Sequence, residues 1–297
     1  MSSSHPPAAA KSGEVGALLE LGKLRLSSMA VFAVIAGLWL GTRQGRDPEW
    51  RLVLFTTLGT LCVAAGGSAL NMLIERGPDG LMERTKGRPL PTGRLSPRTA
   101  LAFGLGAVAT GLVVLAWSTN ALATTVCAAI AVTYVLVYTP LKRITTLNTL
   151  VGAIPGGLPP VVGYAAATGE IDMRAVVLFW ILFFWQIPHF LAIAWRHRVD
   201  YAKGGMKMLP SIDPGGRLTS IQMVVYTIAL ILTTLFGWRV GLAGDLYLIA
   251  ALFLGLALLA PVVLAASARS DAAMRRCFHA TIVYLPLLLI AMMIDRT

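Results

Sequence analysis

The chain has 297 residues, of which 56% are hydrophobic and only 13% are charged, and its mean hydropathy is +0.72. An ordinary soluble domain carries roughly a quarter charged residues, so the composition excludes that class. The formal net charge of +11 would favour nucleic acid as a partner of a soluble protein. In a membrane protein it reflects orientation instead, and we expect no nucleic-acid partner.

Residues 1–25 form a polar tail that is rich in Ser, Pro and Ala and ends with Lys23 and Arg25. No apolar stretch of the signal-peptide type precedes the first hydrophobic segment. Glu14 and Glu20 are atypical of a mitochondrial transit peptide, which is poor in acidic residues. We therefore expect a bacterial inner-membrane protein with a cytoplasmic tail over 1–25 and one transmembrane domain over 26–297.

Apolar segments of the length that crosses a bilayer, about 17–25 residues, recur along the rest of the chain. They predict an all-α polytopic membrane protein, because a transmembrane β-barrel would show shorter segments of alternating polarity. The predicted spans number nine: 26–42, 52–73, 99–117, 121–138, 149–166, 174–195, 219–238, 246–266 and 278–294.

Basic residues are distributed unequally between the two ends of these spans. With the N-terminus in the cytoplasm, 19 of the 25 Lys and Arg residues lie on the cytoplasmic side and 6 on the other. This bias follows the positive-inside rule and places the C-terminus on the opposite side of the membrane. The two long charged loops, which follow the second and sixth spans, then share the cytoplasmic side, where we expect a central cavity to open.

Asn71, Glu75 and Asp79 follow one another at intervals of four residues at the end of the second span. Residues four apart share a helix face. An amide and carboxylates at this spacing suit Mg²⁺, which binds few protein oxygens and completes its coordination with water and phosphate. Because Gly77 and Pro78 disfavour a continuous helix, we expect Asp79 to reach the site from a turn or a short second helix. The alternative is an interfacial helix end with solvated acids.

Basic side chains crowd the loop after this motif, and Arg84, Lys86 and Arg88 are candidates for binding a diphosphate. The planar guanidinium group offers donors that match phosphate oxygens. Tyr138 and Lys142, after the fourth span, are further candidates. Alternatively, the cations fix topology and contact anionic lipid headgroups, and Tyr138 is an interfacial aromatic residue.

The fifth and sixth spans contain unusual residues for a membrane. The fifth span holds four Gly and three Pro residues, which predicts a broken or kinked helix, unless the small residues serve close packing. Gln186 and His189 lie at hydrocarbon depth, where polar groups usually face a cavity or a partner. For His189 the alternative is a hydrogen-bonded core residue. Asp200 and Lys203 follow in the loop and form a second candidate pole for metal and phosphate.

Together these features predict a polar chamber at the cytoplasmic ends of several spans, open to lipid. An allylic diphosphate fits this geometry, with its head in the polar chamber and its isoprenoid tail among the helices. Magnesium and arginine would stabilise the departing diphosphate, which is electrostatic catalysis of an ionisation.

Several segments together resemble the protohaem IX farnesyltransferases, a branch of the UbiA-type intramembrane prenyltransferases. The first acidic motif, over 71–89, marks only the superfamily. The segments that are similar to the haem branch are WQIPHF over 185–190, DY over 200–201 and MLP over 208–210; YTPLKR over 138–143 and PPVVG over 159–163 complete the resemblance.

The resemblance implies nine transmembrane helices, Mg²⁺ as cofactor, and farnesyl diphosphate and haem B as substrates. The implied reaction joins the farnesyl group to a haem vinyl group, adds a hydroxyl to the adjacent carbon, and yields haem O for terminal oxidases. The partners that the resemblance suggests are haem A synthase and oxidase-assembly proteins. Carried onto this chain, the first magnesium site is Asn71, Glu75 and Asp79, Asp200 belongs to the second, and the diphosphate contacts are Arg84, Arg88, Lys142 and Lys203.

This chain departs from the family pattern at two places in the first motif. Glu75 stands where the family usually has Asp, and Gly77-Pro78 is unusual. Around Asp200, basic residues replace the further acids of other branches. We hypothesise that Arg196, His197 and Arg198 meet haem propionates and that His189 lies near the porphyrin.

Two other functions compete with this interpretation. A transporter or haem carrier would need polar residues around mid-membrane, whereas the charges here lie mostly at span ends on one side. A sister prenyltransferase that acts on a quinone precursor or a chlorophyllide would be favoured by more acids near Asp200.

Overall fold

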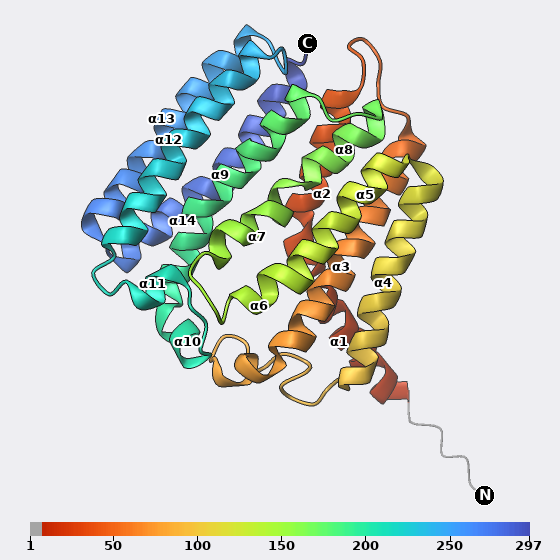
Figure 1. Cartoon of the computed structure of the whole chain (residues 1–297), viewed down its shortest axis with the longest axis vertical. Coiled ribbons are helices and arrows are strands. Elements are labelled where there is room, and N and C mark those ends of the chain that lie inside the picture. The colour runs from red at the N-terminus through yellow and green to blue at the C-terminus, as the bar shows by residue number, and fades with distance from the viewer. Residues whose placement is uncertain (1–7) are drawn as a thin grey trace, which may run out of the picture.

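The computed structural model describes residues 8–297, which form helices joined by short loops, with no β-strand in that range (Figure 1). Residues 1–7 of the predicted tail lie outside the described part. The helices are α1 (Ala8–Gly22), α2 (Leu24–Gly41), α3 (Trp50–Leu81), α4 (Pro97–Ser118), α5 (Ala121–Val132), the π-helix η1 (Thr133–Tyr138), α6 (Thr139–Leu141), α7 (Asn148–Gly157), α8 (Pro159–Thr168), α9 (Met173–Arg196), α10 (Arg198–Lys203), α11 (Leu209–Ile212), α12 (Arg217–Arg239), α13 (Asp245–Ala268) and α14 (Asp271–Ile294).

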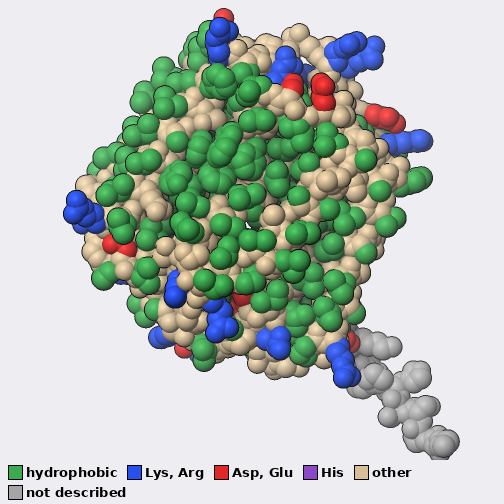
Figure 2. Space-filling model, in the orientation of Figure 1, with side chains coloured by type: hydrophobic (Ala, Val, Ile, Leu, Met, Phe, Trp, Pro, Cys, Tyr) green, Lys and Arg blue, Asp and Glu red, His purple; other side chains and the backbone are tan. Residues whose placement is uncertain are grey.

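The predicted multi-pass, all-α fold is confirmed. Within residues 8–297, eight segments are long and apolar enough to cross a membrane, counting α5 to α6 and α7 to α8 as one segment each. The first predicted span corresponds to α2, whose apolar stretch Ser28–Gly41 is shorter, so the count of nine stays a prediction. Hydrophobic side chains cover the middle of the face in Figure 2, and charged side chains gather toward its edges.

The polar site is built at one end of the bundle, the lower end in Figure 1, where α1, α6, α10 and α11 lie. The described part of the tail is helical there. Ala17 and Leu21 of α1 are buried with Met72 of α3 and with Leu90 and Leu95 of the following loop. The chain's C-terminus lies at the other end (Figure 1).

The expected break at Gly77 and Pro78 is wrong, because α3 continues through both residues to Leu81. A proline normally disfavours helical geometry at the preceding residue, because the proline Cδ clashes with the Cβ of that residue. Gly77 has no Cβ, and the proline lies near the last turn, where few backbone hydrogen bonds are lost. As a result Asn71, Glu75 and Asp79 share one helix face, and all three are buried.

The fifth span is interrupted as predicted, since α7 and α8 meet at Leu158. α8 packs against α2 at very close range. A Cβ on Gly37 would lie 1.9 Å from the carbonyl oxygen of Pro160, and one on Gly163 would lie 2.0 Å from that of Val34. Backbone contact of this kind requires glycine, so part of the predicted small-residue content serves helix packing.

Candidate active site

The residues at this end of the bundle line a polar cavity of about 250 Å³. It gathers side chains from α3, η1, α7, α9 and the loops between them. Its lining residues are Lys23, Asn71, Glu75, Asp79, Met82, Arg84, Arg88, Tyr134, Tyr138, Lys142, Thr149, Phe190, Ile193, Tyr201, Met206 and Met208. Among these described residues, the basic side chains Lys23, Arg84, Arg88 and Lys142 outnumber the carboxylates Glu75 and Asp79, and this predominance of basic groups suits an anion.

Asn71 is oriented by a hydrogen bond to the neighbouring segment. Its Nδ2 donates to Thr139 Oγ1 at 3.0 Å, and Thr139 Oγ1 in turn donates to the carbonyl oxygen of Tyr134 at 2.8 Å. Because the amide nitrogen is used in this way, Asn71 Oδ1 is left for another partner. Thr139 was missed from the sequence, although it lies within the YTPLKR segment.

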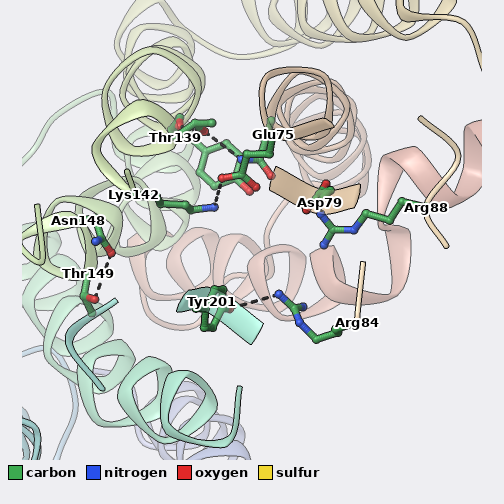
Figure 3. Close-up of polar contacts among 11 residues, drawn as sticks. Glu75, Asp79, Arg84, Arg88, Thr139, Lys142, Asn148, Thr149 and Tyr201 are labelled. Carbon is green, nitrogen blue, oxygen red and sulfur yellow. Dashed lines mark hydrogen bonds and ion pairs between the residues drawn. The ribbon is translucent and has the colours of Figure 1, made fainter. Parts of the chain in front are cut away.

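Each carboxylate of the motif is paired with a cation (Figure 3). Glu75 Oε1 lies 2.8 Å from Lys142 Nζ, and Asp79 Oδ2 lies 2.6 Å from Arg88 Nη1. The Tyr138 ring covers the Lys142 ammonium at 4.5 Å from its centroid. The structure therefore brings together five of the residues predicted for metal and diphosphate in one buried cluster.

This oxygen set fits a hard divalent cation. Asp79 Oδ1 is buried and accepts no hydrogen bond from any described residue. Asn71 uses its amide nitrogen for the bond to Thr139, which leaves Asn71 Oδ1 available to a ligand. Carboxylate and amide oxygens with room for water and phosphate are typical of Mg²⁺. Within residues 8–297, no group of three or more His, Cys, Asp or Glu side chains is arranged to hold a metal by itself. A metal here would need phosphate oxygens as additional ligands.

Lys23 borders the cavity, whereas the sequence analysis placed it in the polar tail and gave it no role in the site. It lies between α1 and α2 with φ 47°, and it borders the cavity together with the acidic motif. Burial, reinforced by the positive charges of Arg88 and Lys142, lowers the pKa of Lys23 to about 7. Its position directly before an apolar helix was the only signal in the sequence.

Arg84 borders the cavity on the side of the loop after α3, and Asp200 holds this loop. Arg84 Nη2 donates to the Tyr201 hydroxyl at 3.3 Å, and its guanidinium lies over the Tyr201 ring (Figure 3). Asp200 accepts the backbone N–H groups of Glu83 and Arg84 at 3.1 and 3.0 Å. These bonds, that of Arg84 first, hold the pKa of Asp200 below its usual range. Asp200 anchors this loop and is not among the residues that line the cavity.

Two predicted diphosphate ligands lie outside the cavity. Lys86 is exposed and forms an ion pair with Glu83 at 2.5 Å. Lys203 is exposed at the end of α10. Neither borders the cavity in this structure.

The four residues predicted to contact haem are also separate from the cavity lining. Arg196 is exposed at the end of α9. Arg198 Nη1 donates to Asp271 Oδ1 and to the carbonyl oxygen of Trp195. Burial, followed by the charges of Arg84 and Arg196, lowers the pKa of His197.

His189 lies between α9 and α14. Its Nδ1 is 2.8 Å from Thr281 Oγ1, which donates to the carbonyl oxygen of Phe278. The His189 ring stacks on Trp185 and packs against Phe278. The hydrogen-bonded core role considered for His189 therefore has a direct structural basis.

A second, largely apolar cavity of about 240 Å³ lies beside the polar one. Helices α2, α3, α5, α7, α8, α9 and α14 contribute to it, as does η1. Of the described residues, Tyr134 alone borders both cavities. Gly152 makes room for the Tyr138 ring, since a Cβ there would lie 2.5 Å from Tyr138 Cε2. A π-helix at a functional site is a recurrent arrangement, and here it carries both tyrosines.

Comparison with solved structures shows the same fold at low sequence identity. A digeranylgeranylglyceryl phosphate synthase has a TM-score of 0.76 and 16% identity, covering 95% of this chain and 98% of its own. A UbiA homologue from Archaeoglobus fulgidus, solved with DMAPP and Mg²⁺, has a TM-score of 0.62 and 15% identity, covering 93% of this chain and 98% of its own.

Sequence comparison gives nearer relatives. A protoheme IX farnesyltransferase from Solibacter usitatus is 41% identical over 285 residues, which cover 94% of this chain and 98% of the relative. Another from Sorangium cellulosum is 42% identical over 280 residues, covering 90% and 99%. Residues 30–285 match the UbiA prenyltransferase family, which confirms the resemblance predicted from the motifs. This chain belongs to the UbiA prenyltransferase family.

Proposed function

We propose that this protein is a Mg²⁺-dependent prenyltransferase that transfers the farnesyl group of farnesyl diphosphate to a vinyl group of haem B. A hydroxyl is added to the adjacent carbon, giving haem O and diphosphate. The observation that carries this proposal is the junction at Tyr134, where a cationic cavity meets an apolar one. That pair of cavities matches an amphiphile with a diphosphate head and an isoprenoid tail.

The substrate class is supported by the near relatives, which are named protoheme IX farnesyltransferase and align over nearly their whole length. The metal is supported by the UbiA homologue that holds Mg²⁺ beside DMAPP. We propose that the protein lies in a bacterial inner membrane with the polar cavity on the cytoplasmic side, in line with the distribution of its basic residues.

In this mechanism Asn71, Glu75 and Asp79 would hold Mg²⁺, which supplies positive charge to the oxygens of the departing diphosphate. Arg88 and Lys142 are already paired with these carboxylates. With Mg²⁺ held by these carboxylates, Arg88 and Lys142 would be left to contact the phosphate oxygens. Such fixed donors stabilise the charge that develops as the C1–O bond breaks.

In our proposal haem approaches the junction of the two cavities from outside, so that its vinyl group reaches the apolar cavity. Arg196, exposed at the end of α9, remains a candidate for a haem propionate, with His197 beside it. Arg196→Ala should raise the KM for haem with little change in the KM for farnesyl diphosphate. An unchanged KM for haem would remove Arg196 from the haem site. Arg198→Ala is less specific, because Arg198 also holds Asp271.

The test of the function uses purified protein, haem B and farnesyl diphosphate, with and without Mg²⁺. Mass spectrometry should detect haem that has gained a farnesyl group and the elements of water, only when Mg²⁺ is present. Asp79→Asn should abolish this product. The matched control is Asp47→Asn, an exposed carboxylate at the opposite end of the bundle. Full activity in Asp79→Asn would remove Asp79 from the metal site.

A further inference from the structure

The apolar cavity contains one amide side chain whose orientation is fixed by its neighbours. Gln186 of α9 is 3% exposed and lines this cavity. Its Nε2 donates to the carbonyl oxygen of Leu182 at 2.9 Å and faces that of Ala153 at 3.4 Å. Since both neighbours are acceptors, the nitrogen must face them, and Oε1 must point the other way. No described residue donates a hydrogen bond to Oε1.

A glycine on the facing helix accommodates this oxygen. α7 and α9 lie side by side (Figure 1), and a Cβ on Gly156 would lie 1.9 Å from Gln186 Oε1. Any larger residue at 156 would displace the carbonyl. The hydrogen bonds of Nε2 fix the amide of Gln186, and Gly156 leaves room for Oε1. Together they hold a hydrogen-bond acceptor in the largely apolar cavity.

The acceptor lines the cavity that meets the diphosphate cavity at Tyr134. Gly156 follows Gly152 by one helical turn, about 6 Å along α7. Gly152 contacts the Tyr138 ring, and Tyr134 of the same π-helix borders the diphosphate cavity. Gln186 lines the cavity and uses only its Nε2 in hydrogen bonds to described residues, so Oε1 favours a small donor from the cavity such as water.

We propose that Gln186 Oε1 holds the water molecule that supplies the hydroxyl group of the product. This inference rests on the proposed farnesyl transfer to haem. In that reaction the C1–O bond breaks with its electron pair leaving on the diphosphate. The π electrons of the vinyl group form the new bond to C1, which leaves a cation on the vinyl carbon next to the porphyrin ring.

The water then decides the fate of that cation. Its oxygen lone pair forms the C–O bond, and a proton is released to a diphosphate oxygen. Without a held water, the cation loses a proton from the newly bonded carbon instead, and an alkene forms. The alkene differs from the alcohol by the elements of one water, so the two products separate clearly by mass. Gln186 thus selects hydration over elimination.

The experiment measures the ratio of alcohol to alkene for farnesylated haem made by the full-length enzyme. Gln186→Leu should lower this ratio by about tenfold or more, the factor that corresponds to roughly one hydrogen bond to the reacting water. Gly156→Ala should lower it as well, because its Cβ displaces the same carbonyl. Gln222→Leu on α12, which borders neither cavity, is the matched control and should leave the ratio unchanged.

The ratio is independent of how much protein folds, so partial misfolding does not imitate the effect. If Gln186→Leu yields no folded protein, Gly156→Ala decides alone. An unchanged ratio in the folded variants would overturn the role of Gln186 while leaving the farnesyl transfer intact. Absence of any farnesylated haem with the unaltered enzyme would instead overturn the proposed function itself.

Discussion

Replacing Arg88 by alanine tests the buried charge pair of the polar cavity. The side chains of Asp79 and Arg88 are 1% and 17% exposed, and their charged atoms are 2.6 Å apart. Removing one partner of a buried ion pair costs about 3–5 kcal/mol, because the other charge stays buried without compensation. Since Arg88 borders a polar cavity, we expect the lower end of that range, about 3 kcal/mol. The double variant Asp79→Asn/Arg88→Ala buries no uncompensated charge and should be more stable than Arg88→Ala.

The assay is thermal unfolding of the detergent-solubilised protein at one scan rate, with chelator present. For a chain of this size, 3 kcal/mol corresponds to a shift of about 6 °C in apparent Tm. Added Mg²⁺ should restore part of the loss in Arg88→Ala and less in the double variant, because only the former keeps the carboxylate that binds the ion. If the double variant unfolds no later than Arg88→Ala, the two side chains do not form the pair, and the reasoning fails.

Three further substitutions test packing and loop anchoring. Gly152→Ala should slow product formation, because the new Cβ would lie 2.5 Å from the Tyr138 ring; Gly106→Ala, with nothing within 4 Å, is its control, and equal rates would contradict the contact. Gly163→Ala places a Cβ 2.0 Å from a backbone oxygen of α2, so size-exclusion chromatography should recover little monodisperse protein, and normal recovery would count against the close α2–α8 packing. Asp200→Asn should speed hydrogen exchange at the two N–H groups that its carboxylate accepts. Because the pKa of Asp200 is lowered, its anchoring is present at neutral pH and is lost as the pH falls through that lowered pKa; unchanged exchange would exclude the anchor.

Several features of the site were predictable because they depend on local patterns. The four-residue spacing of Asn71 and Glu75 places both on one helix face wherever the helix packs. Buried carboxylates need cations nearby, and the structure pairs Glu75 with Lys142 and Asp79 with Arg88. The glycines and prolines of the fifth span likewise predicted its interruption.

Other features were not predictable from the sequence. Lys86 and Arg88 are two residues apart, yet one is exposed and the other is bonded to Asp79. The contact of Asp200, a predicted metal ligand, with two backbone N–H groups of the loop after α3 had no signal in the sequence. Lys23 was assigned to topology but borders the cavity. Each difference depends on a loop conformation or on a contact between distant segments.

The sequence by itself determined the membrane class, the succession of apolar helices, the shared helix face of Asn71 and Glu75, and the family, because hydropathy, helical periodicity and motif spacing are properties of short segments. Only the tertiary structure decided which cations border the cavity, that α3 passes through Gly77 and Pro78, and that Gln186 presents its carbonyl oxygen to the apolar space. Those outcomes depend on packing between helices that are far apart in the chain, and the free energy of such contacts is not encoded in the pattern of any one segment.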